Sequence, residues 1–232
     1  MGIKAAIDIG TNSTRFLMVD EDSAGVIHPV IMREHITMLG QGVDVTRALA
    51  TEAMERVFKA VDEYMDLCQK HSISKVVIFA TSATRDASNS LFFLKEISKR
   101  THLIPRVLSG EEEAYYSFQG AISDQESDQS YLVCDIGGGS TEFIFGDKNS
   151  VVKKNSLDIG SLRLTEKFIH HDPPTTGELK TLEAFLHQQM ITYFTPPWVT
   201  RAIFVGGTAT TLAMMDGQFD LDESFKAHKY IL

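Results

Sequence analysis

One short pattern occurs twice in this sequence and constrains the fold more than any other feature. In residues 131–146 an apolar run leads to Asp135, a triple glycine and two hydroxyl side chains, and a second apolar run follows. Residues 6–19 repeat this order. Two short apolar runs joined by a glycine-rich turn predict a hairpin of buried strands. The matching positions are Asp8 with Asp135, Ile9 with Ile136, Gly10 with Gly137, Ser13 with Ser140, Thr14 with Thr141 and Phe16 with Phe143.

A second pair of segments stays in register with the hairpins. An apolar run at residues 76–80 leads into TSATRDA, and another at residues 202–205 leads into GGTATTLA. Ala83, Thr84 and Ala87 in the first match Ala209, Thr210 and Ala213 in the second. We therefore predict a duplicated unit, with two similar halves that face each other across a cleft.

The triple-glycine turn is suited to binding phosphate. Gly137, Gly138 and Gly139 have no Cβ, so the backbone can adopt φ > 0 and lie close to a ligand, with its N–H groups directed at oxygen atoms. The sequence contains neither a P-loop nor a GxGxxG turn, so this prediction depends on the paired turns. The alternative is that each glycine-rich segment is only a tight turn.

Strands alternate with helices in both halves, which predicts an α/β protein. The strands expected after each hairpin are 26–36, 76–80, 103–108, 151–159 and 202–205, and the expected helices are 46–71, 87–100, 109–121, 161–170, 178–194 and one from about 208. The polar run at residues 123–130 predicts the connection between an N-terminal domain, 1–124, and a C-terminal domain, 125–232. We expect the second domain to lack a strand and one or two helices that the first contains.

Composition narrows the possible functions. The formal net charge of −9 argues against a protein that coats long nucleic acid or an anionic membrane. Cys68 and Cys134 fall on a predicted helix face and within a predicted strand, which argues against a disulfide framework or a zinc site. No signal-peptide pattern and no membrane-length apolar run occur. We therefore expect a soluble, cytoplasmic protein.

Three residues near the turns have side chains suited to phosphate or metal binding. Asp8 and Asp135 each end an apolar strand at the mouth of a turn, where a carboxylate needs a cation or a hydrogen-bond donor. Mg²⁺ with its water ligands is a natural partner. Arg85 follows a buried strand and could hold phosphate in a bidentate contact. A surface ion pair with Asp86 or a nearby glutamate is the alternative for Arg85.

Two acidic or histidine-containing segments have structural explanations as well as functional ones. In SGEEEA, from Ser109, the serine and Glu112 fit a capping box, and acidic residues in a first helical turn favour the helix dipole. The pattern alone therefore selects no single glutamate. His170, His171 and Asp172 could be metal ligands, but adjacent residues do not share a helix face, which favours a polar helix end.

Together these segments resemble the exopolyphosphatase and guanosine pentaphosphate phosphohydrolase family (Ppx/GppA), within the superfamily of actin, sugar kinases and heat-shock ATPases. The resemblance extends over nearly the whole chain and rests on DIGTNSTRFL from Asp8, LGQGVD from Leu39, ATSATRDA from Ala80, SGEEEA from Ser109, DIGGGSTE from Asp135, IGSLRLTE from Ile159 and VGGTATTLA from Val205. It implies two tandem ribonuclease H-like domains around a cleft. It also implies release of terminal phosphate from polyphosphate, guanosine pentaphosphate or both.

The resemblance further implies roles for individual residues. Glu113 would orient the attacking water and accept its proton. Asp8, Asp135 and Glu142 would hold Mg²⁺. The phosphate-binding residues would be Thr11, Asn12, Ser13, Arg85, Gly137, Gly138, Gly139, Ser140, Gly207 and Thr208.

Two other functions stay open. An ATP-dependent kinase of the same superfamily would place its adenosine at the turn around Gly206, and a non-catalytic sensor would bind a phosphorylated nucleotide without hydrolysing it. An incomplete second sheet would have an unpaired edge, and such edges recruit other chains. We therefore expect either a homodimer that covers this edge or a shortened version of a longer, more stable chain.

Overall fold

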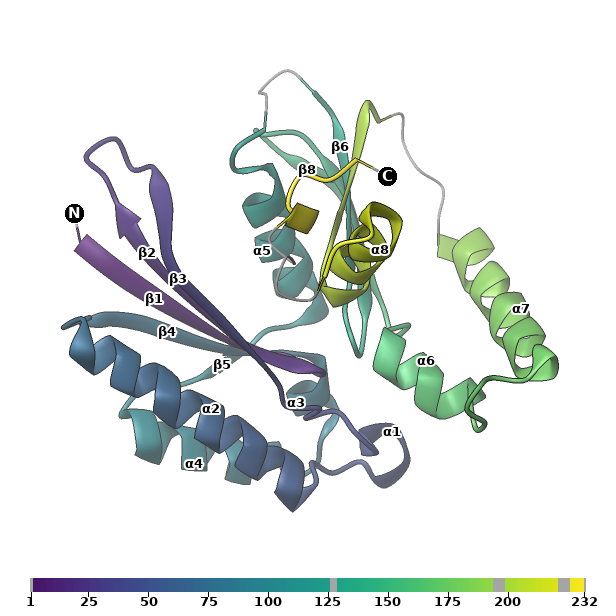
Figure 1. The fold of residues 1–232 in the computed structure, drawn as a ribbon, viewed down its shortest axis with the longest axis horizontal. Helices are drawn as coiled ribbons and strands as arrows, with labels where there is room; N and C mark the ends of the chain where they lie inside the picture. Colours follow the sequence, from purple (N-terminus) through teal and green to yellow (C-terminus); the bar gives the residue numbers. More distant parts are fainter. Residues whose placement is uncertain (1, 126–128, 194–198, 221–225, 232) are drawn as a thin grey trace. The chain divides into compact units, whose positions relative to one another are not determined.

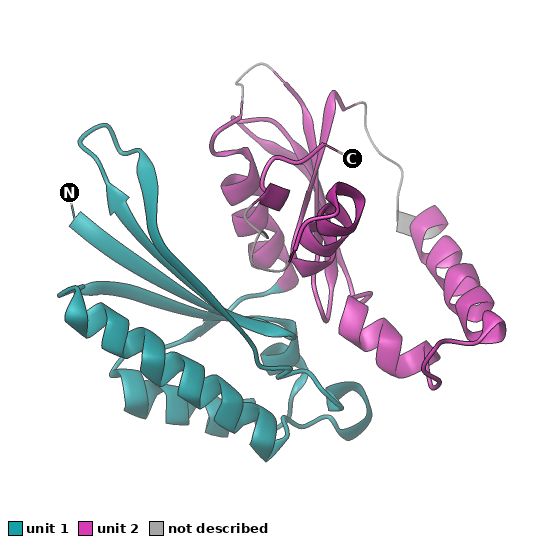
Figure 2. Cartoon of the chain, in the orientation of Figure 1, with its two compact units in different colours: residues 1–109 teal, residues 110–232 magenta. Residues whose placement is uncertain are grey.

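The computed structural model describes residues 2–125, 129–193, 199–220 and 226–231. It divides into two compact units, residues 1–109 and residues 110–232 (Figure 2). None of the helices in the described ranges is long and apolar enough to cross a membrane.

The first unit is built on a five-stranded sheet with the order β3-β2-β1-β4-β5. Its elements are β1 (Gly2–Ile9), β2 (Ser13–Glu21), β3 (Ile27–Ile36), α1 (Val43–Thr46), α2 (Thr51–Lys70), β4 (Lys75–Ala80), α3 (Ser82–Asp86), α4 (Ser90–Thr101) and β5 (Arg106–Val107). β1 is antiparallel to β2 and parallel to β4. The predicted hairpin and the buried strand after it are therefore neighbours in one sheet.

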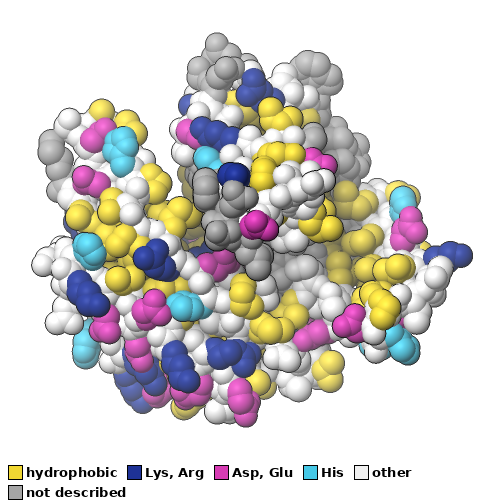
Figure 3. All heavy atoms as spheres, viewed as in Figure 1, with side chains coloured by type: hydrophobic (Ala, Val, Ile, Leu, Met, Phe, Trp, Pro, Cys, Tyr) yellow, Lys and Arg dark blue, Asp and Glu magenta, His cyan; other side chains and the backbone are white. Residues whose placement is uncertain are grey.

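Two helices cover one face of this sheet. The helix predicted at residues 46–71 is α2, and it buries Met54, Val57, Phe58 and Val61. Phe58 stacks on Phe93 of α4, with ring centroids 5.6 Å apart, so α2 and α4 lie side by side (Figure 1). Charged side chains of both signs are interspersed over the outer surface of this helical layer (Figure 3).

The second unit is built on a four-stranded sheet with the order β8-β7-β6-β9. Its elements are α5 (Gly110–Ile122), β6 (Tyr131–Ile136), β7 (Thr141–Gly146), β8 (Val151–Leu157), α6 (Ser161–Phe168), α7 (Thr176–Tyr193), β9 (Arg201–Val205) and α8 (Gly207–Gly217). The end predicted for α7, at residue 194 and the following Pro196 and Pro197, lies outside the described residues.

The second sheet is covered on both faces, because alternate residues of its strands point to opposite sides. Tyr131 and Val133 of β6 pack against Phe118 of α5. Leu132 and Cys134 face the other way and belong to the cluster formed with α6 and α7. Figure 1 shows α5 on one side of this sheet and α6 and α7 on the other.

The compact units divide between Ser109 and Gly110 because α5 packs on the second sheet. The sequence analysis instead predicted a domain boundary after residue 124, and this boundary stays a prediction. Part of the predicted connection, residues 126–128, lies outside the described residues.

The duplication is confirmed by the strand order. Each unit has a hairpin, a third strand antiparallel to its second strand, and a fourth strand parallel to its first. The first sheet continues to β5, whereas no strand flanks the outer edge of β9 among the described residues. The protein therefore has two ribonuclease H-like α/β units, and the described part of the second lacks a counterpart of β5.

Candidate functional site

The two hairpin turns close with the same hydrogen bond. The Gly10 N–H donates to the Ser13 carbonyl at 2.9 Å, and the Gly137 N–H donates to the Ser140 carbonyl at 3.0 Å. Positions matched in the sequence therefore occupy matching places in the two turns.

The carbonyl side of the triple-glycine turn is held by the start of α6. The Gly137 carbonyl accepts from Ser161 N and the Gly138 carbonyl from Leu162 N, both at 2.9 Å. The Gly139 carbonyl accepts from Arg163 Nε at 2.7 Å. A Cβ at Gly160 would overlap the Gly138 backbone, so a glycine is required for this close approach.

Strand register places acidic and hydroxyl side chains in a row across the second sheet. Asp135 of β6 lies opposite Glu142 of β7, which lies opposite Ser156 of β8. Ser156 Oγ donates to Glu142 Oε1 at 2.7 Å, and Ser117 Oγ of α5 donates to Asp135 Oδ2 at 2.5 Å. The two serines were absent from the predicted site.

Glu142 is the most strongly perturbed carboxyl of this row. Burial, the negative charge of Glu113 and, more weakly, that of Asp135 raise the pKa of Glu142 to about 8. Hydrogen bonds from Ser156 and Ser140 oppose this increase. Only 1% of Glu142 is exposed. Without a bound cation the Glu142 carboxyl therefore favours its protonated form at pH 7, whereas a cation would favour its ionised form. Glu113 lies close enough to influence it.

The acidic start of α5 is thus part of the same site. Gly110 lies against β8, where an added Cβ would come within 2.8 Å of Ser156 Oγ. Lys154 of β8 pairs with Glu111 at 3.2 Å. The start of α5 therefore lies beside β8, and the charges of Glu113 and Asp135 both act on Glu142. A catalytic or metal-binding role for these three residues stays a prediction.

The donor set fits a hard cation such as Mg²⁺ that keeps much of its water. All the donors are oxygen atoms of carboxyl and hydroxyl groups, which Mg²⁺ prefers, and it is commonly held by one or two carboxylates together with substrate phosphates. The described residues contain no group of three or more histidine, cysteine, aspartate or glutamate side chains poised to hold a metal ion. The role of Asp135 and Glu142 as metal ligands stays a prediction.

The first unit differs at the corresponding position. Asp8 lies opposite Arg15, and Arg15 lies opposite Glu34. Arg15 Nε donates to Glu34 Oε1 at 2.9 Å. Burial alone would raise the pKa of Glu34, but the hydrogen bond from Ser13 and the charge of Arg15 hold it below its usual value. A cation therefore stands where the second unit has Glu142, and the role of Asp8 as a metal ligand stays a prediction.

The remaining predicted residues of the first unit surround its turn. Asn12 O accepts from the backbone of Thr37 and Met38 at 3.0 and 2.8 Å. Thr11 Oγ1 accepts from the Ala83 N–H, at the start of α3, at 3.3 Å. Arg85 Nη1 donates to the Leu108 carbonyl at 2.7 Å. Arg85 is thus fixed by the backbone before α5, and its contact with phosphate stays a prediction.

In the second unit, Gly206 lies close against the end of β6, and phosphate binding by Gly207 and Thr208 stays a prediction. Gly206 has φ +93°, and a Cβ there would come within 2.6 Å of the Ile136 carbonyl and 2.9 Å of Asp135 Oδ1. Gly207 and Thr208 follow directly at the start of α8.

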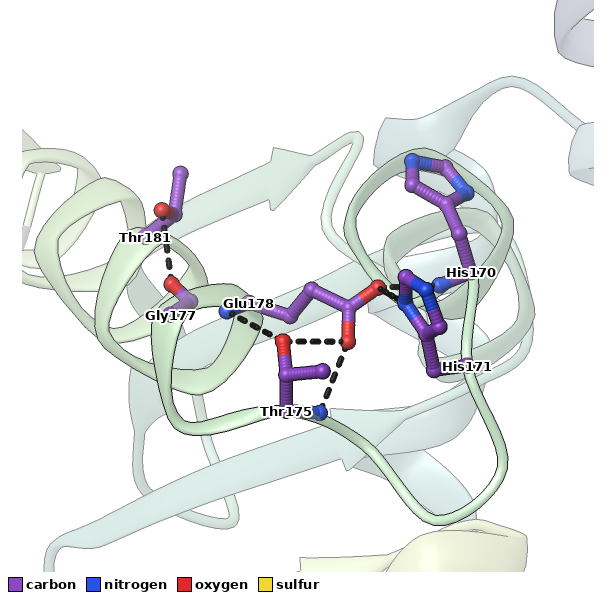
Figure 4. A network of polar contacts seen from close by, with 6 residues as sticks. All are labelled: His170, His171, Thr175, Gly177, Glu178 and Thr181. Carbon is purple, nitrogen blue, oxygen red and sulfur yellow. Dashed lines mark hydrogen bonds and ion pairs between the residues drawn. The ribbon is translucent and has the colours of Figure 1, made fainter.

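The histidines before α7 belong to a helix cap (Figure 4). Glu178 Oε1 accepts from His170 N at 2.7 Å and lies 2.9 Å from His171 Nδ1. Glu178 Oε2 accepts from Thr175 N, while Thr175 Oγ1 accepts from Glu178 N. This reciprocal arrangement is a capping box. The hydrogen bond with His171, followed by those from Thr175 and His170, holds the pKa of Glu178 well below its usual value.

Two similar α/β units, each opening with a hairpin closed by the same turn hydrogen bond, define the class of fold. The Ppx/GppA phosphatase family model matches residues 18–223. Exopolyphosphatase 2 of Mycobacterium tuberculosis is 39% identical over 223 residues, which is 91% of this chain. The chain therefore belongs to the Ppx/GppA phosphatase family.

The chain is also similar to a longer bifunctional enzyme and to a protein of known crystal structure. A bifunctional 3-dehydroquinate synthase/phosphatase of Fusobacterium nucleatum is 41% identical over 72% of this chain. The crystal structure of an exopolyphosphatase-like protein matches with a TM-score of 0.87 and 36% identity, over 94% of this chain and 69% of that one. The chain spans 26% of the length of the bifunctional enzyme and 70% of exopolyphosphatase 2.

Proposed function

We propose that this protein releases terminal phosphate from inorganic polyphosphate, guanosine pentaphosphate, or both, by attack of water. The observation that supports the proposal is that the charges of Glu113 and Asp135 both act on the buried Glu142 carboxyl, two residues after the triple-glycine turn and Ser140. The similarity to exopolyphosphatase 2 favours polyphosphate.

The chemistry follows from positions and charges. Backbone N–H groups of the turn from Gly137 to Ser140 bind phosphate oxygens, and residues 11–13 with Arg85 bind further phosphates. Asp135 and Glu142, with Asp8, would hold Mg²⁺, which supplies positive charge to offset that of the phosphates. Glu113 orients a water molecule in line with the scissile bond and accepts its proton. Positioning and electrostatics suffice for this reaction.

Two alternatives have the same fold. In an ATP-dependent kinase, the turn at Gly206 would meet adenosine, and a sensor would bind nucleotide without turnover. The position of Glu113 beside Glu142 favours hydrolysis over both, because a glutamate there is available to activate water.

The proposal is tested by measuring phosphate release, with malachite green, from polyphosphates of several lengths and from guanosine nucleotides. Glu113→Gln keeps the shape of the side chain but cannot accept the proton, so hydrolysis should fall by about 100-fold or more. Glu111→Gln on the same helical turn is the matched control, because Glu111 pairs with Lys154 at the surface.

If Glu113→Gln hydrolyses phosphoanhydrides as fast as the parent, Glu113 does not activate the attacking water. Formation of adenosine diphosphate only when an acceptor is added would identify the kinase. Tight nucleotide binding without phosphate release would identify the sensor.

A further inference from the structure

The three carbonyl groups of the glycine turn are all held from one side. Ser161 N, Leu162 N and Arg163 Nε donate to the carbonyls of Gly137, Gly138 and Gly139, as described above. Arg163 N adds a second bond to the Gly138 carbonyl at 3.1 Å.

Because each peptide group is planar, fixing the direction of a carbonyl also fixes the direction of the N–H of the following residue. In a trans peptide the carbonyl of one residue and the N–H of the next point in opposite directions. Holding the carbonyls of residues 137–139 toward α6 therefore directs the N–H groups of Gly138, Gly139 and Ser140 away from α6. Successive N–H groups turned to one side form a concave anion-binding surface.

Of these three peptide groups, the one between Gly139 and Ser140 is held through the side chain of Arg163. The Gly137 and Gly138 carbonyls accept from backbone N–H groups, which almost any sequence would supply. In the described part of the chain, the donor recorded for the Gly139 carbonyl is the guanidinium of Arg163. The corresponding carbonyl in the first unit, that of Asn12, accepts from the backbone N–H groups of Thr37 and Met38 instead.

We propose that Arg163 is a positioning residue, which orients the peptide between Gly139 and Ser140 so that the Ser140 N–H binds a substrate phosphate. The proposal rests on the proposed function, because the phosphate it describes is that of the same substrate. Arg163 acts through the backbone.

The test compares Arg163→Met with Arg163→Lys. Methionine keeps an unbranched side chain but donates no hydrogen bond, whereas lysine retains a donor. Loss of one phosphate contact made in both the ground state and the transition state raises KM and leaves kcat largely unchanged. We expect Arg163→Met to raise KM for polyphosphate by about tenfold, and Arg163→Lys to restore part of the affinity.

Lys167→Met is the matched control. Lys167 lies on the same helix, but its ammonium group is over the Phe185 ring, 4.5 Å from the ring centroid. This variant removes a positive charge from α6 without removing a contact to the turn, and KM should stay at the parent value.

A readout independent of hydrolysis is the amide spectrum of the protein with inorganic phosphate as the probe. In the parent, phosphate should shift the amide resonances of Gly138, Gly139 and Ser140. In Arg163→Met the Ser140 shift should be lost, while the Gly138 shift persists because Gly137 is still held by α6.

A Ser140 shift and a KM that are unchanged in Arg163→Met would overturn the proposal, as would an equal loss in Lys167→Met. Phosphate-induced shifts in a parent that hydrolyses no phosphoanhydride would overturn the proposed function and leave the role of Arg163 standing. If Arg163→Met does not fold, the Arg163→Lys spectrum decides. A reduced Ser140 shift beside a parent-like Gly138 shift supports the proposal, and a Ser140 shift equal to that of the parent contradicts it.

Discussion

At the scale of single residues, the two hairpins differ most at Arg15 and Glu142, which occupy the same place in the repeat. Arg15 brings a positive charge opposite Asp8, and Glu142 brings a buried carboxyl opposite Asp135. An arginine favours anion binding, whereas paired carboxyl groups favour a cation or a shared proton. The same position in the two copies of the repeat therefore favours an anion in the first unit and a cation or proton in the second.

The raised pKa of Glu142 predicts a pH-dependent stability. The unfolded chain releases this proton near the ordinary value of 4.5, whereas the folded protein keeps it until about pH 8. Between these values the folded state binds more protons, so stability should fall as the pH rises. Melting curves in metal-free buffer should show this fall in the parent, and Glu142→Gln should flatten it.

Glu178 should change stability with pH in the opposite direction to Glu142. Its pKa is lowered, so its contribution to stability is lost as the pH falls below the ordinary value of 4.5, outside the window assigned to Glu142. A parent and a Glu142→Gln variant that lose stability in parallel between pH 5 and 8 would show that another group is responsible.

The sequence predicted the carboxyl groups of the site but missed their hydroxyl partners. Asp135, Glu142 and Glu113 lie within recognisable motifs. Ser117 follows Glu113 by one helical turn, so helix periodicity contained a signal for it. Ser156 required the register between β7 and β8, which shifts at Phe145 and Gly146, so counting outward from the turn would have failed.

At the scale of elements, the approach of α6 to the glycine turn depends on Gly160. A Cβ there would overlap backbone atoms of Gly138 and Gly139, which cannot rotate away as a side chain would. Gly160→Ala should therefore displace the turn, lower the free energy of unfolding by about 1–3 kcal/mol, and weaken phosphate binding. Urea unfolding and phosphate titration measure the two effects.

Gly177→Ala in α7 is the control for this prediction, because a Cβ at Gly177 has open space. Removing a glycine from a helix should stabilise the protein by about 0.5–1 kcal/mol. Equal effects of the two substitutions would mean that the turn tolerates a side chain at residue 160.

The capping box of α7 makes a separate prediction. Thr175→Ala removes the hydroxyl that accepts from the Glu178 N–H, so the free energy of unfolding should fall by about 1 kcal/mol. Urea unfolding measures this change. Thr175→Ser retains the hydroxyl and should remain close to the parent, and a loss as large as that of alanine would argue against the cap.

The sequence predicted which segments are strands and which are helices better than it predicted their lengths. The strand expected at 103–108 contains only Arg106 and Val107, which pair with Phe79 and Ala80 of β4. Pro105, just before it, has no N–H to donate to a sheet. The positive φ expected for the triple-glycine turn is also absent, because Gly137, Gly138 and Gly139 all have negative φ. The glycine that the close approach of α6 requires is Gly160.

At the scale of the whole molecule, the outer edge of β9 predicts self-association. Its counterpart β4 is covered by β5, and Phe204 on β9 is 52% exposed. Hydrophobic side chains also gather along α7 (Figure 3), where Leu179, Leu182, Leu186 and Met190 line a groove of about 350 Å³. Among the described residues no strand pairs with this edge of β9, and such edges recruit other chains. A homodimer through β9 is therefore one of the two alternatives predicted from the sequence.

Sedimentation of the 232-residue chain tests this expectation. Phe204→Lys should shift the protein toward monomer, because a charge on β9 disfavours a second strand. Val152→Lys on β8 is the control, since β8 and its counterpart β3 are both edge strands. A monomeric parent at high concentration would contradict the prediction.

The position of α5 has a consequence during synthesis of the chain. The helix is made before β6, β7 and β8, the strands that form its packing surface. At about 5–20 residues per second, these strands follow several seconds later. In that interval Ala114, Phe118 and Ile122 form an apolar stripe with no sheet to cover it, beside a first unit that is already complete. During synthesis, the covering of this stripe on α5 therefore waits for the strands of the second sheet.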